Sequence, residues 1–374
     1  MKSPNSSLPV PTMPASGFSI TSRLAVATLI GCLCMALQSA QAATKEWTAS
    51  SSTNLAGASN WTPTGAPATS DEVVFSSVPN TSLTTGNTLT WGDLVWNTNT
   101  SASMAIASGQ SSNRVFTLSG GGGSSAATAA GGAAGDLILL GSNVTTATLV
   151  ISGTTSTEGT GRLRMAVGAD GNFHVKNAGA ALTITADITG NYNLTKTGAG
   201  TLTLGAANTF GADKTFTVEA GTVNANHTAA LGSGNVAVSG GSLTMNEAGV
   251  GSIILKADKS FSMSAGTLGF SFESVSSHDQ IIGSGTGTFS ITGGIIDLTN
   301  SITDYSVTYA LFRDFSSGSV ANLTFINYDN ANYIASLGND GVLSFSAIPE
   351  SSTAAALLGG LVLALVVWHR RQQG

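Results

Sequence analysis

Polar and apolar residues alternate along residues 178–289 in short runs, and many runs begin just after a glycine. The run Thr201-Leu202-Thr203-Leu204, which follows Gly200, is one example. A period of two residues is typical of a β-strand with one buried face. Glycine suits the corner before such a strand because it can take a positive φ there. The pattern therefore predicts short strands separated by glycine-containing corners.

One short phrase built on this pattern returns five times at similar intervals. Its glycines lie 21, 20, 25 and 21 residues apart, and they are Gly200, Gly221, Gly241, Gly266 and Gly287. Gly179 adds a looser copy 21 residues earlier. A period of this length indicates coils that stack and bury one continuous core. We expect the first four of these glycines to line one edge of the stack, about 4.8 Å apart per coil.

Proline distribution supports strands that all bond to a neighbour. No proline occurs between Pro79 and Pro349, and proline cannot donate to a ladder of hydrogen bonds. The pattern predicts an all-β fold, a β-solenoid. An ordinary antiparallel sandwich with evenly spaced strands is the alternative.

Residues 194–223 resemble the autotransporter-associated β-strand repeat. They read TKTGAGTLTL over 195–204, ANTF over 207–210 and VEAGTV over 218–223. Phe210 stands where that family usually has tyrosine, and residues 212–214 replace its preferred glycine and threonine. The resemblance implies a right-handed parallel β-helix in an exported surface protein, with the solenoid repeats expected over residues 136–290.

Residues 1–42 have the three parts of a signal peptide. A long N-terminal region with Lys2 and Arg23 precedes an apolar stretch at 24–37, and the small residues Ala40 and Ala42 follow in an Ala-x-Ala pattern. We therefore expect signal peptidase to cleave before Ala43. Residues 29–32 also read as a lipobox with Cys32 as the acylated residue, which is the alternative.

Both cysteines, Cys32 and Cys34, lie in this signal segment. After cleavage the chain would contain no cysteine. Neither a disulfide nor a cysteine-based metal site is therefore expected.

Residues 43–119 are expected to form an N-terminal β module that caps the stack. They hold four tryptophans in an order similar to that of many proteins with the same repeat: Trp47, Trp61, Trp91 and Trp96. A cap must cover the open end of a solenoid, where strand edges would otherwise stay unpaired. A platform on which sugar rings stack is the alternative for these side chains.

Two further segments differ in composition from the repeats. Residues 120–135 read GGGGSSAATAAGGAAG, which predicts a flexible loop with nothing to build a core. Residues 291–347 hold four of the five tyrosines and are expected to form a C-terminal β cap. A binding surface is the alternative for this aromatic segment.

Composition narrows the range of functions. Only 9% of the 374 residues are charged, 46 are glycine and the net charge is −6. Such a balance is typical of an exported β-rich protein and argues against nucleic acid as a partner.

Residues that could carry catalysis are scattered. The one adjacent acidic pair is Asp71-Glu72, and Ser277-His278-Asp279 stand in a row. Neighbours in a strand point to opposite faces, so this adjacency does not indicate a catalytic triad. Arg162 and Arg164 are expected on one solvated face of a strand. We identify no catalytic residue, no metal site and no cofactor site.

The tail at 348–374 resembles a PEP-CTERM sorting signal. Pro349 and Glu350 match the first two residues of the motif, whereas Ser351 replaces its second proline. An apolar run at 354–368 and the basic pair Arg370 and Arg371 complete the order. The run predicts a short membrane helix with its basic end in the cytoplasm. The resemblance implies processing by an exosortase, a membrane protease of Gram-negative bacteria that make exopolysaccharide; a plain anchor is the alternative.

Together these features predict a non-catalytic, exported structural protein. It would pass through the inner membrane and reach the cell surface or an extracellular polysaccharide matrix, with exopolysaccharide as a further partner. Two other functions remain open. A surface adhesin or glycan-binding protein would need an exposed aromatic or acidic groove, and a polysaccharide-processing β-helix enzyme would need clustered acids on one face.

Overall fold

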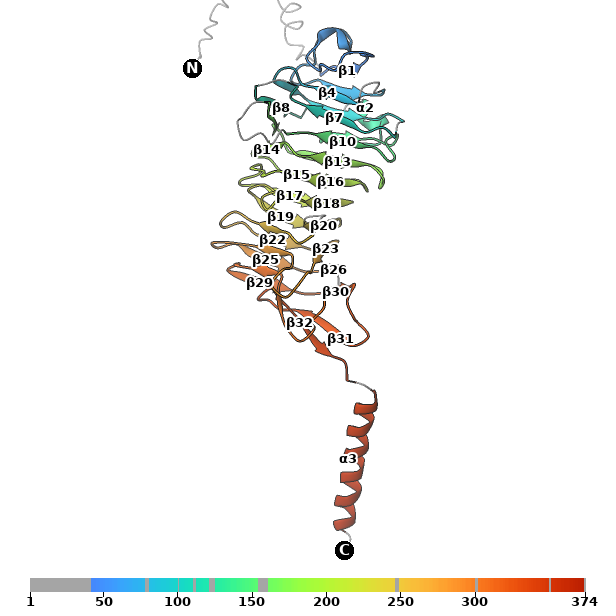
Figure 1. Ribbon diagram of the computed structural model, residues 1–374, viewed down its shortest axis with the longest axis vertical. Helices are drawn as coiled ribbons and strands as arrows, with labels where there is room; N and C mark the ends of the chain where they lie inside the picture. The colour runs from blue at the N-terminus through green and yellow to red at the C-terminus, as the bar shows by residue number, and fades with distance from the viewer. Residues whose placement is uncertain are drawn as a thin grey trace, which may run out of the picture. The chain divides into compact units, whose positions relative to one another are not determined.

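The computed structural model describes residues 42–77, 81–99, 101–109, 112–120, 125–153, 161–245, 249–299, 302–349 and 351–372. Within this part the chain forms short strands that return to the same side of a coil at each circuit (Figure 1). Ala40 and nearly all of the predicted signal peptide lie outside the described residues.

Two long sheets run through the coils. In pairing order, sheet A consists of β2 (Trp61–Thr62), β1 (Thr44–Trp47), β3 (Glu72–Phe75), β6 (Asp93–Trp96), β9 (Asp136–Leu140), β12 (Gly171–Val175), β15 (Leu194–Thr197), β17 (Thr215–Val218), β19 (Asn235–Val238), β22 (Phe261–Met263), β25 (Thr288–Ile291) and β29 (Ser317–Val320). Sheet B consists of β4 (Ser82–Thr84), β7 (Met104–Ala107), β10 (Thr148–Ile151), β13 (Ala181–Ile184), β16 (Thr201–Leu204), β18 (Thr222–Ala225), β20 (Ser242–Met245), β23 (Thr267–Ser271), β26 (Gly294–Thr299) and β30 (Leu323–Ile326).

The third side of the coil is built from two shorter sheets. Sheet C holds β5 (Leu89–Trp91), β8 (Arg114–Leu118), β11 (Leu163–Val167) and β14 (Asp187–Thr189). Sheet D holds β21 (Ser252–Ile254), β24 (Gln280–Ile282) and β28 (Phe312–Arg313). Between sheets C and D, the third side of the coil consists of connecting segments in which no strand is described. The repeat is shortest in these coils.

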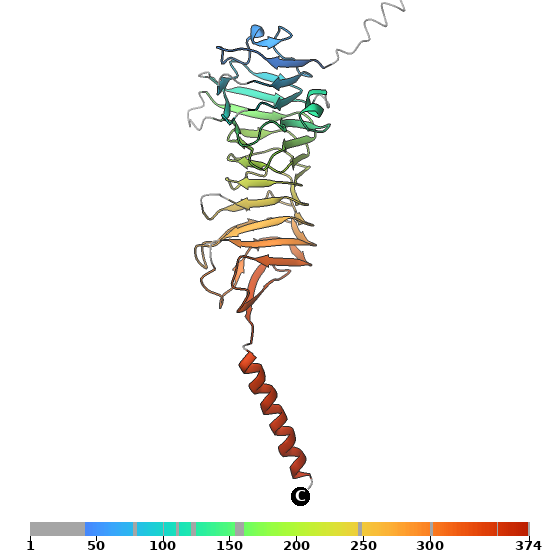
Figure 2. The same ribbon diagram turned by 90° about the vertical axis from the view of Figure 1, so that its right-hand side faces the viewer.

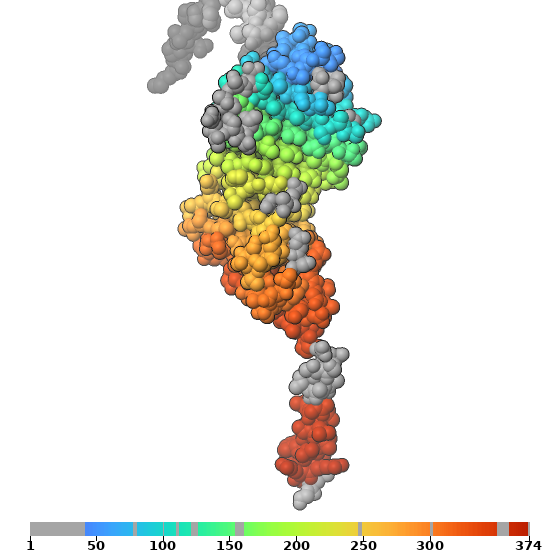
Figure 3. Space-filling model, in the orientation of Figure 1, coloured from blue at the N-terminus to red at the C-terminus, as the bar shows by residue number. Residues whose placement is uncertain are grey.

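Parallel pairing defines the architecture. Leu182 pairs with Leu202, Leu202 with Val223, Val223 with Leu243 and Leu243 with Leu268, and all five side chains are buried. Figure 2 shows the coils one above another, and Figure 3 shows their colours following one another in bands. This arrangement confirms an all-β fold with long parallel sheets, as expected of a β-solenoid, and it excludes the antiparallel sandwich.

Four of the predicted corner glycines do line one edge of sheet B. The amide of Thr222 donates to Gly200 O, Ser242 to Gly221 O and Thr267 to Gly241 O. Gly221 and Gly266 have φ of 69° and 91°, where other residues would be strained. At Gly241 close approach is the reason, since a Cβ there would lie 2.9 Å from Gly221 O.

The fifth copy of the phrase lies on a different side of the coil from the first four. Gly287 precedes β25, which belongs to sheet A, and Gly294 takes the next place in sheet B. The amide of Ile295 accordingly donates to Gly266 O at 2.9 Å. Gly-Thr followed by alternation can begin a strand on either long side, so the phrase alone does not identify the sheet.

Residues 120–135, predicted to be a flexible loop, contain the short helix α2 (Ser125–Ala129). Ala127 and Ala130 are buried in a second cluster with Val74, Val95 and Leu139, on the outer face of sheet A. Small side chains let this segment approach the sheet closely. The expectation that it builds no core was therefore wrong.

Both ends of the stack depart from parallel pairing. At the N-terminal end β1 pairs antiparallel with β2, and a 3-10 helix (Ala58–Asn60) lies just before β2. At the C-terminal end β27 (Tyr309–Ala310), β32 (Val342–Ala347) and β31 (Tyr333–Leu337) form an antiparallel sheet. Its Leu337 and Leu343 are buried in the main core.

Helix α3 (Ser351–Arg371) contains the apolar run of the tail and ends at the predicted basic pair. Among the residues that are described, no helix is long and apolar enough to cross a membrane. The predicted membrane span is therefore not confirmed.

Candidate functional site

The four N-terminal tryptophans form a packed core and not a platform. Trp47, Trp61, Trp91 and Trp96 are each at most 1% exposed. The rings of Trp47 and Trp61 meet edge to face with centroids 4.9 Å apart, and those of Trp61 and Trp91 do so at 5.7 Å. Trp61 Nε1 donates to Leu55 O at 3.0 Å. No ring face of this cluster is therefore available to a sugar, as the cap interpretation requires and the platform alternative does not allow.

The acidic pair at the start of the module also has structural partners. Asp71 is 6% exposed, and its two oxygens accept the amides of Ala43 at 3.0 Å and Ala68 at 2.8 Å. Glu72 accepts the amide of Ala127 at 3.0 Å and so holds α2 against sheet A. The two neighbours use their carboxylates separately, as alternation along a strand requires.

Arg162, just before β11, and Arg164, within it, share one partner. Their guanidinium groups lie 2.9 and 2.8 Å from the two oxygens of Asp187, which belongs to the next strand of sheet C. Both arginines are about half exposed, whereas the Asp187 side chain is 6% exposed. The shared face was predicted, but the buried carboxylate between the two guanidinium groups was not.

Ser277, His278 and Asp279 bond to different partners and form no relay. Ser277 Oγ donates to Glu273, and His278 stacks on Phe272 with ring centroids 5.8 Å apart. Asp279 accepts the backbone amides of Gly251 and Ser271. Burial raises the pKa of Asp279 to about 6, although these amides oppose the shift. The three residues therefore stabilise a hairpin between β23 and β24.

Sequence reasoning missed a buried lysine in the repeat. Lys196 is fully buried, and its Nζ donates to the carbonyls of Thr197 and Gly198 at 2.8 Å each and of Ala220 at 3.1 Å. Burial lowers its pKa to about 8. Its position two residues after the inward Leu194 was the available signal, since alternation directs both side chains to the core.

A second polar group lies on sheet A near α2. Asp136 accepts the amide of Ala133 at 2.8 Å and the side-chain amide of Asn172 at 3.0 Å. His174 Nδ1 lies 3.8 Å from Asp136 and 3.1 Å from Thr197 Oγ1. Burial lowers the pKa of His174, and Asp136 only partly opposes the shift. One carboxylate and one imidazole that are held this way tie coils together.

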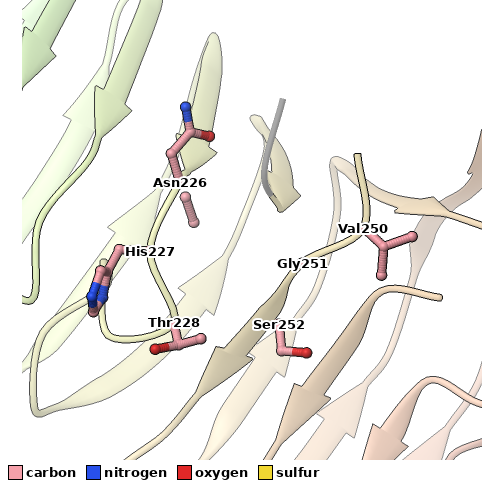
Figure 4. A pocket seen from close by; sticks show the side chains of 7 residues that line it. Asn226, His227, Thr228, Val250, Gly251 and Ser252 are labelled. Carbon is pink, nitrogen blue, oxygen red and sulfur yellow. The ribbon is translucent and has the colours of Figure 1, made fainter. Parts of the chain in front are cut away.

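A surface hollow lies on the third side of the coil, between sheets C and D. Its lining includes His227, Thr228 and Ser252, and its volume is about 320 Å³ (Figure 4). His227 Nδ1 accepts the amide of Ala229 at 3.0 Å. Among the described residues, no carboxylate, lysine or arginine lines the hollow, and His227 is the one titratable side chain there.

The predicted processing sites fall at the two ends of the described chain. Ala42 and Ala43 precede β1, and Ser351 begins α3. Pro349 is exposed, Glu350 lies outside the described residues, and Arg370 and Arg371 end α3. Within the described residues no group of three or more His, Cys, Asp or Glu side chains is arranged to hold a metal ion.

Comparison with known proteins adds no relative. No protein-family model, no curated protein and no solved structure matches this chain. The two family resemblances noted in the sequence therefore stay predictions.

Proposed function

We propose that this chain is a non-catalytic structural protein of a bacterial cell surface or extracellular polysaccharide matrix. Its β-domain, a right-handed parallel β-helix, would act as a stiff spacer capped at both ends. The tail would hold it at the membrane until an exosortase-type protease releases it. Signal peptidase and that protease are the proposed processing partners.

The use of the buried polar side chains supports a structural role. Lys196, Asp187 and Asp279 each bond to a neighbouring coil or hairpin. Asn208 is 1% exposed and joins three coils, since it accepts the amide of Ile188 and donates to Ala230 O. Buried polar groups must be satisfied in this way for a stack to be stable. Side chains committed to such bonds have little capacity left for catalysis.

The tail supports the proposed sorting. In the second half of α3, from Leu361 to Trp368, the large apolar side chains are exposed, with Leu361 at 64% and Leu363 at 69%. Apolar surface of this kind is stabilised by transfer out of water, by about 0.8 kcal/mol per CH₂ group. The adjacent Arg370 and Arg371 would stay on the cytoplasmic side, because carrying each across costs about 2.5 kcal/mol or more.

Mass spectrometry of the protein released by the source cells tests this proposal. We expect a form that starts at Ala43 and lacks residues 354–374, and we expect deletion of the exosortase to keep the protein cell-bound. The variant Glu350→Ala should also stay cell-bound, whereas Glu219→Ala, an exposed acid in the repeats, should be released normally. Release with an intact tail, or release that does not depend on the exosortase, would leave the tail as a plain anchor.

A further inference from the structure

We infer that a pocket at the C-terminal end of the stack binds an uncharged sugar residue. The pocket has a volume of about 390 Å³, within the range of about 300–1,000 Å³ found for small-molecule sites. Its walls come from β25, β27, β28, the loop after β28, the start of β29, the turn between β31 and β32 and the start of β32.

Three phenylalanine rings form the apolar wall. Phe289 and Phe312 stack with centroids 4.8 Å apart, and Phe315 meets Phe289 edge to face at 5.4 Å. Phe289 and Phe312 are almost fully buried, whereas Phe315 is only partly buried. The backbone of Gly283 fixes the Phe315 ring, since a Cβ there would lie 2.5 Å from its Cδ1. Phe315 therefore offers a fixed aromatic surface to a ligand.

Gly318 leaves room for the Phe289 ring beside the pocket. It pairs with Phe289 in the register of sheet A, so it occupies the place of an apolar side chain in the column. A Cβ at Gly318 would overlap the Phe289 ring and the carbonyl oxygen of Asn339. The amides of Leu311 and Phe312 donate to Gly341 O at 3.0 and 3.1 Å and hold the opposite turn in place.

Hydrogen-bond donors and acceptors surround the three phenylalanine rings. Arg313 Nε lies 3.2 Å from Asp314 Oδ2, and both side chains are at least half exposed. Asp340 accepts the amide of Val342 at 3.1 Å, and Asn339 lies beside it. Carboxylates accept hydrogen bonds, a guanidinium donates them and an amide does both. An array of hydroxyl groups on a ring uses all three kinds of partner.

The charges and rings favour an uncharged sugar over an acidic one. The charged side chains that line the pocket are one arginine and two aspartates, so a carboxylated sugar would meet net repulsion. The negative face of an aromatic ring attracts the slightly positive C–H groups of a pyranose. The proposed surface role explains only where such a sugar would be met. Binding itself is measured on the purified chain and does not depend on that role.

Saturation-transfer NMR with the full chain in a sugar-free zwitterionic detergent tests the site. The probes are the methyl glycosides of glucose, galactose, mannose and N-acetylglucosamine, with glucuronate as the acidic comparison. We expect saturation of the ring C–H protons of at least one neutral probe and weaker transfer to glucuronate. No transfer to any neutral probe, or stronger transfer to glucuronate, overturns the inference.

Variants locate the binding. Phe315→Ala should weaken it about tenfold or more, which corresponds to about 1.4 kcal/mol, and Phe315→Trp should retain it. Asp340→Asn keeps an oxygen for the Val342 amide and should weaken binding through the lost charge. Tyr192→Ala removes an exposed ring elsewhere and should change nothing. Equal binding by Phe315→Ala and the native chain would place the ligand outside this pocket.

A second observation concerns the proposed cleavage site. We infer that cleavage before Ala43 creates an ion pair between the new terminal ammonium and Asp71. The nitrogen of Ala43 already lies 3.0 Å from Asp71 Oδ1, and the amide of Glu72 donates to Ala43 O at 3.0 Å. Conversion of this amide to an ammonium group next to a nearly buried carboxylate strengthens the hydrogen bond, because both partners are then charged.

This inference rests on the proposed processing, and its test separates the two. Mass spectrometry first identifies the N-terminal residue of the released protein, and a residue other than Ala43 overturns the inference. A chain that starts at Ala43 is then compared with its N-acetylated form by hydrogen exchange at the Glu72 amide. Acetylation should lower protection about fivefold. Equal protection in the two forms would show that no ion pair forms. The same conclusion would follow if acetylation lowered protection equally in the native chain and in the Asp71→Asn variant.

Discussion

Individual residues in this stack are constrained mainly by the coil above and the coil below. Gly221 illustrates the point. Its corner has a positive φ, and it also lies against the carbonyls of Gly198 and Gly200 and the ammonium of Lys196. Lys196 in turn donates to the carbonyl of Ala220. The corner at Gly221 therefore links neighbouring coils, and the effect of changing one of its residues depends on the others.

Substitution at this corner should be costly. Gly221→Ala forces an L side chain into a strained φ and places its Cβ against two carbonyl oxygens. We expect the free energy of unfolding to fall by about 1–3 kcal/mol, measured by urea unfolding. Gly205→Ala is the control, since its nearest neighbour would be Thr185 Cγ2 at 3.3 Å. An equal loss in both variants would contradict this account of the corner.

Lys196 should make the free energy of unfolding rise with pH in the alkaline range. Its pKa is lowered from 10.5 to about 8 by burial, so between these pH values the unfolded chain holds a proton that the folded chain has released. Stability then rises with pH across this window, because the unfolded state binds more protons. In Lys196→Met this rise should disappear, whereas it should persist in Lys256→Met, an exposed control. Urea unfolding between about pH 7.5 and 10.5 measures how the free energy of unfolding changes with pH. Identical slopes in the two variants would show that Lys196 does not cause the rise.

At the scale of elements, helix α2 shows how tertiary contacts fix a segment that has little helical stability of its own. It has only five residues, SAATA, and a helix this short is not stable alone. Ala127 and Ala130 bury against Val74, Val95 and Leu139, and Glu72 and Asp136 accept amides of this segment. Tertiary contacts therefore decide this element.

A charge at the α2 interface should detach it. Ala130→Asp would bury a carboxylate without a partner, and we expect a loss of about 2 kcal/mol or more in stability. Hydrogen exchange should increase in residues 126–133. Ala129→Asp places the same charge on an exposed position of the helix and should leave exchange nearly unchanged. Slow exchange in Ala130→Asp would mean that the segment does not depend on this contact.

At the scale of the whole β-domain, each coil contacts mainly its neighbours, so stability is expected to be distributed along the stack. The N-terminal end is closed by aromatic rings, of which Trp61 contacts Trp47, Phe75 and Trp91. The C-terminal end is closed by the antiparallel hairpin of β31 and β32. The ends therefore protect a stack whose middle coils support one another.

Loss of the N-terminal closure should act locally. Trp61→Ala removes a fully buried ring, which costs about 3–5 kcal/mol in compact proteins. We expect faster hydrogen exchange in β1, β3 and β6 and unchanged exchange in β22 and β25. Phe210→Ala, a buried ring near the middle, should instead increase exchange in the coils on both sides of it. Uniform loss of protection in Trp61→Ala would indicate one cooperative unit.

Sequence alone determined the strands, the coil period and the burial of alternate residues, because alternation and corner glycines are local and recur. It also predicted the shared face of Arg162 and Arg164 and favoured the tryptophan cap. Only the tertiary structure decided that Gly287 precedes a strand of sheet A, that Lys196 is buried among carbonyls and that residues 125–130 cover a sheet. The physical reason is that these outcomes depend on which side of which coil a residue meets, and that neighbour lies about twenty residues away in the chain.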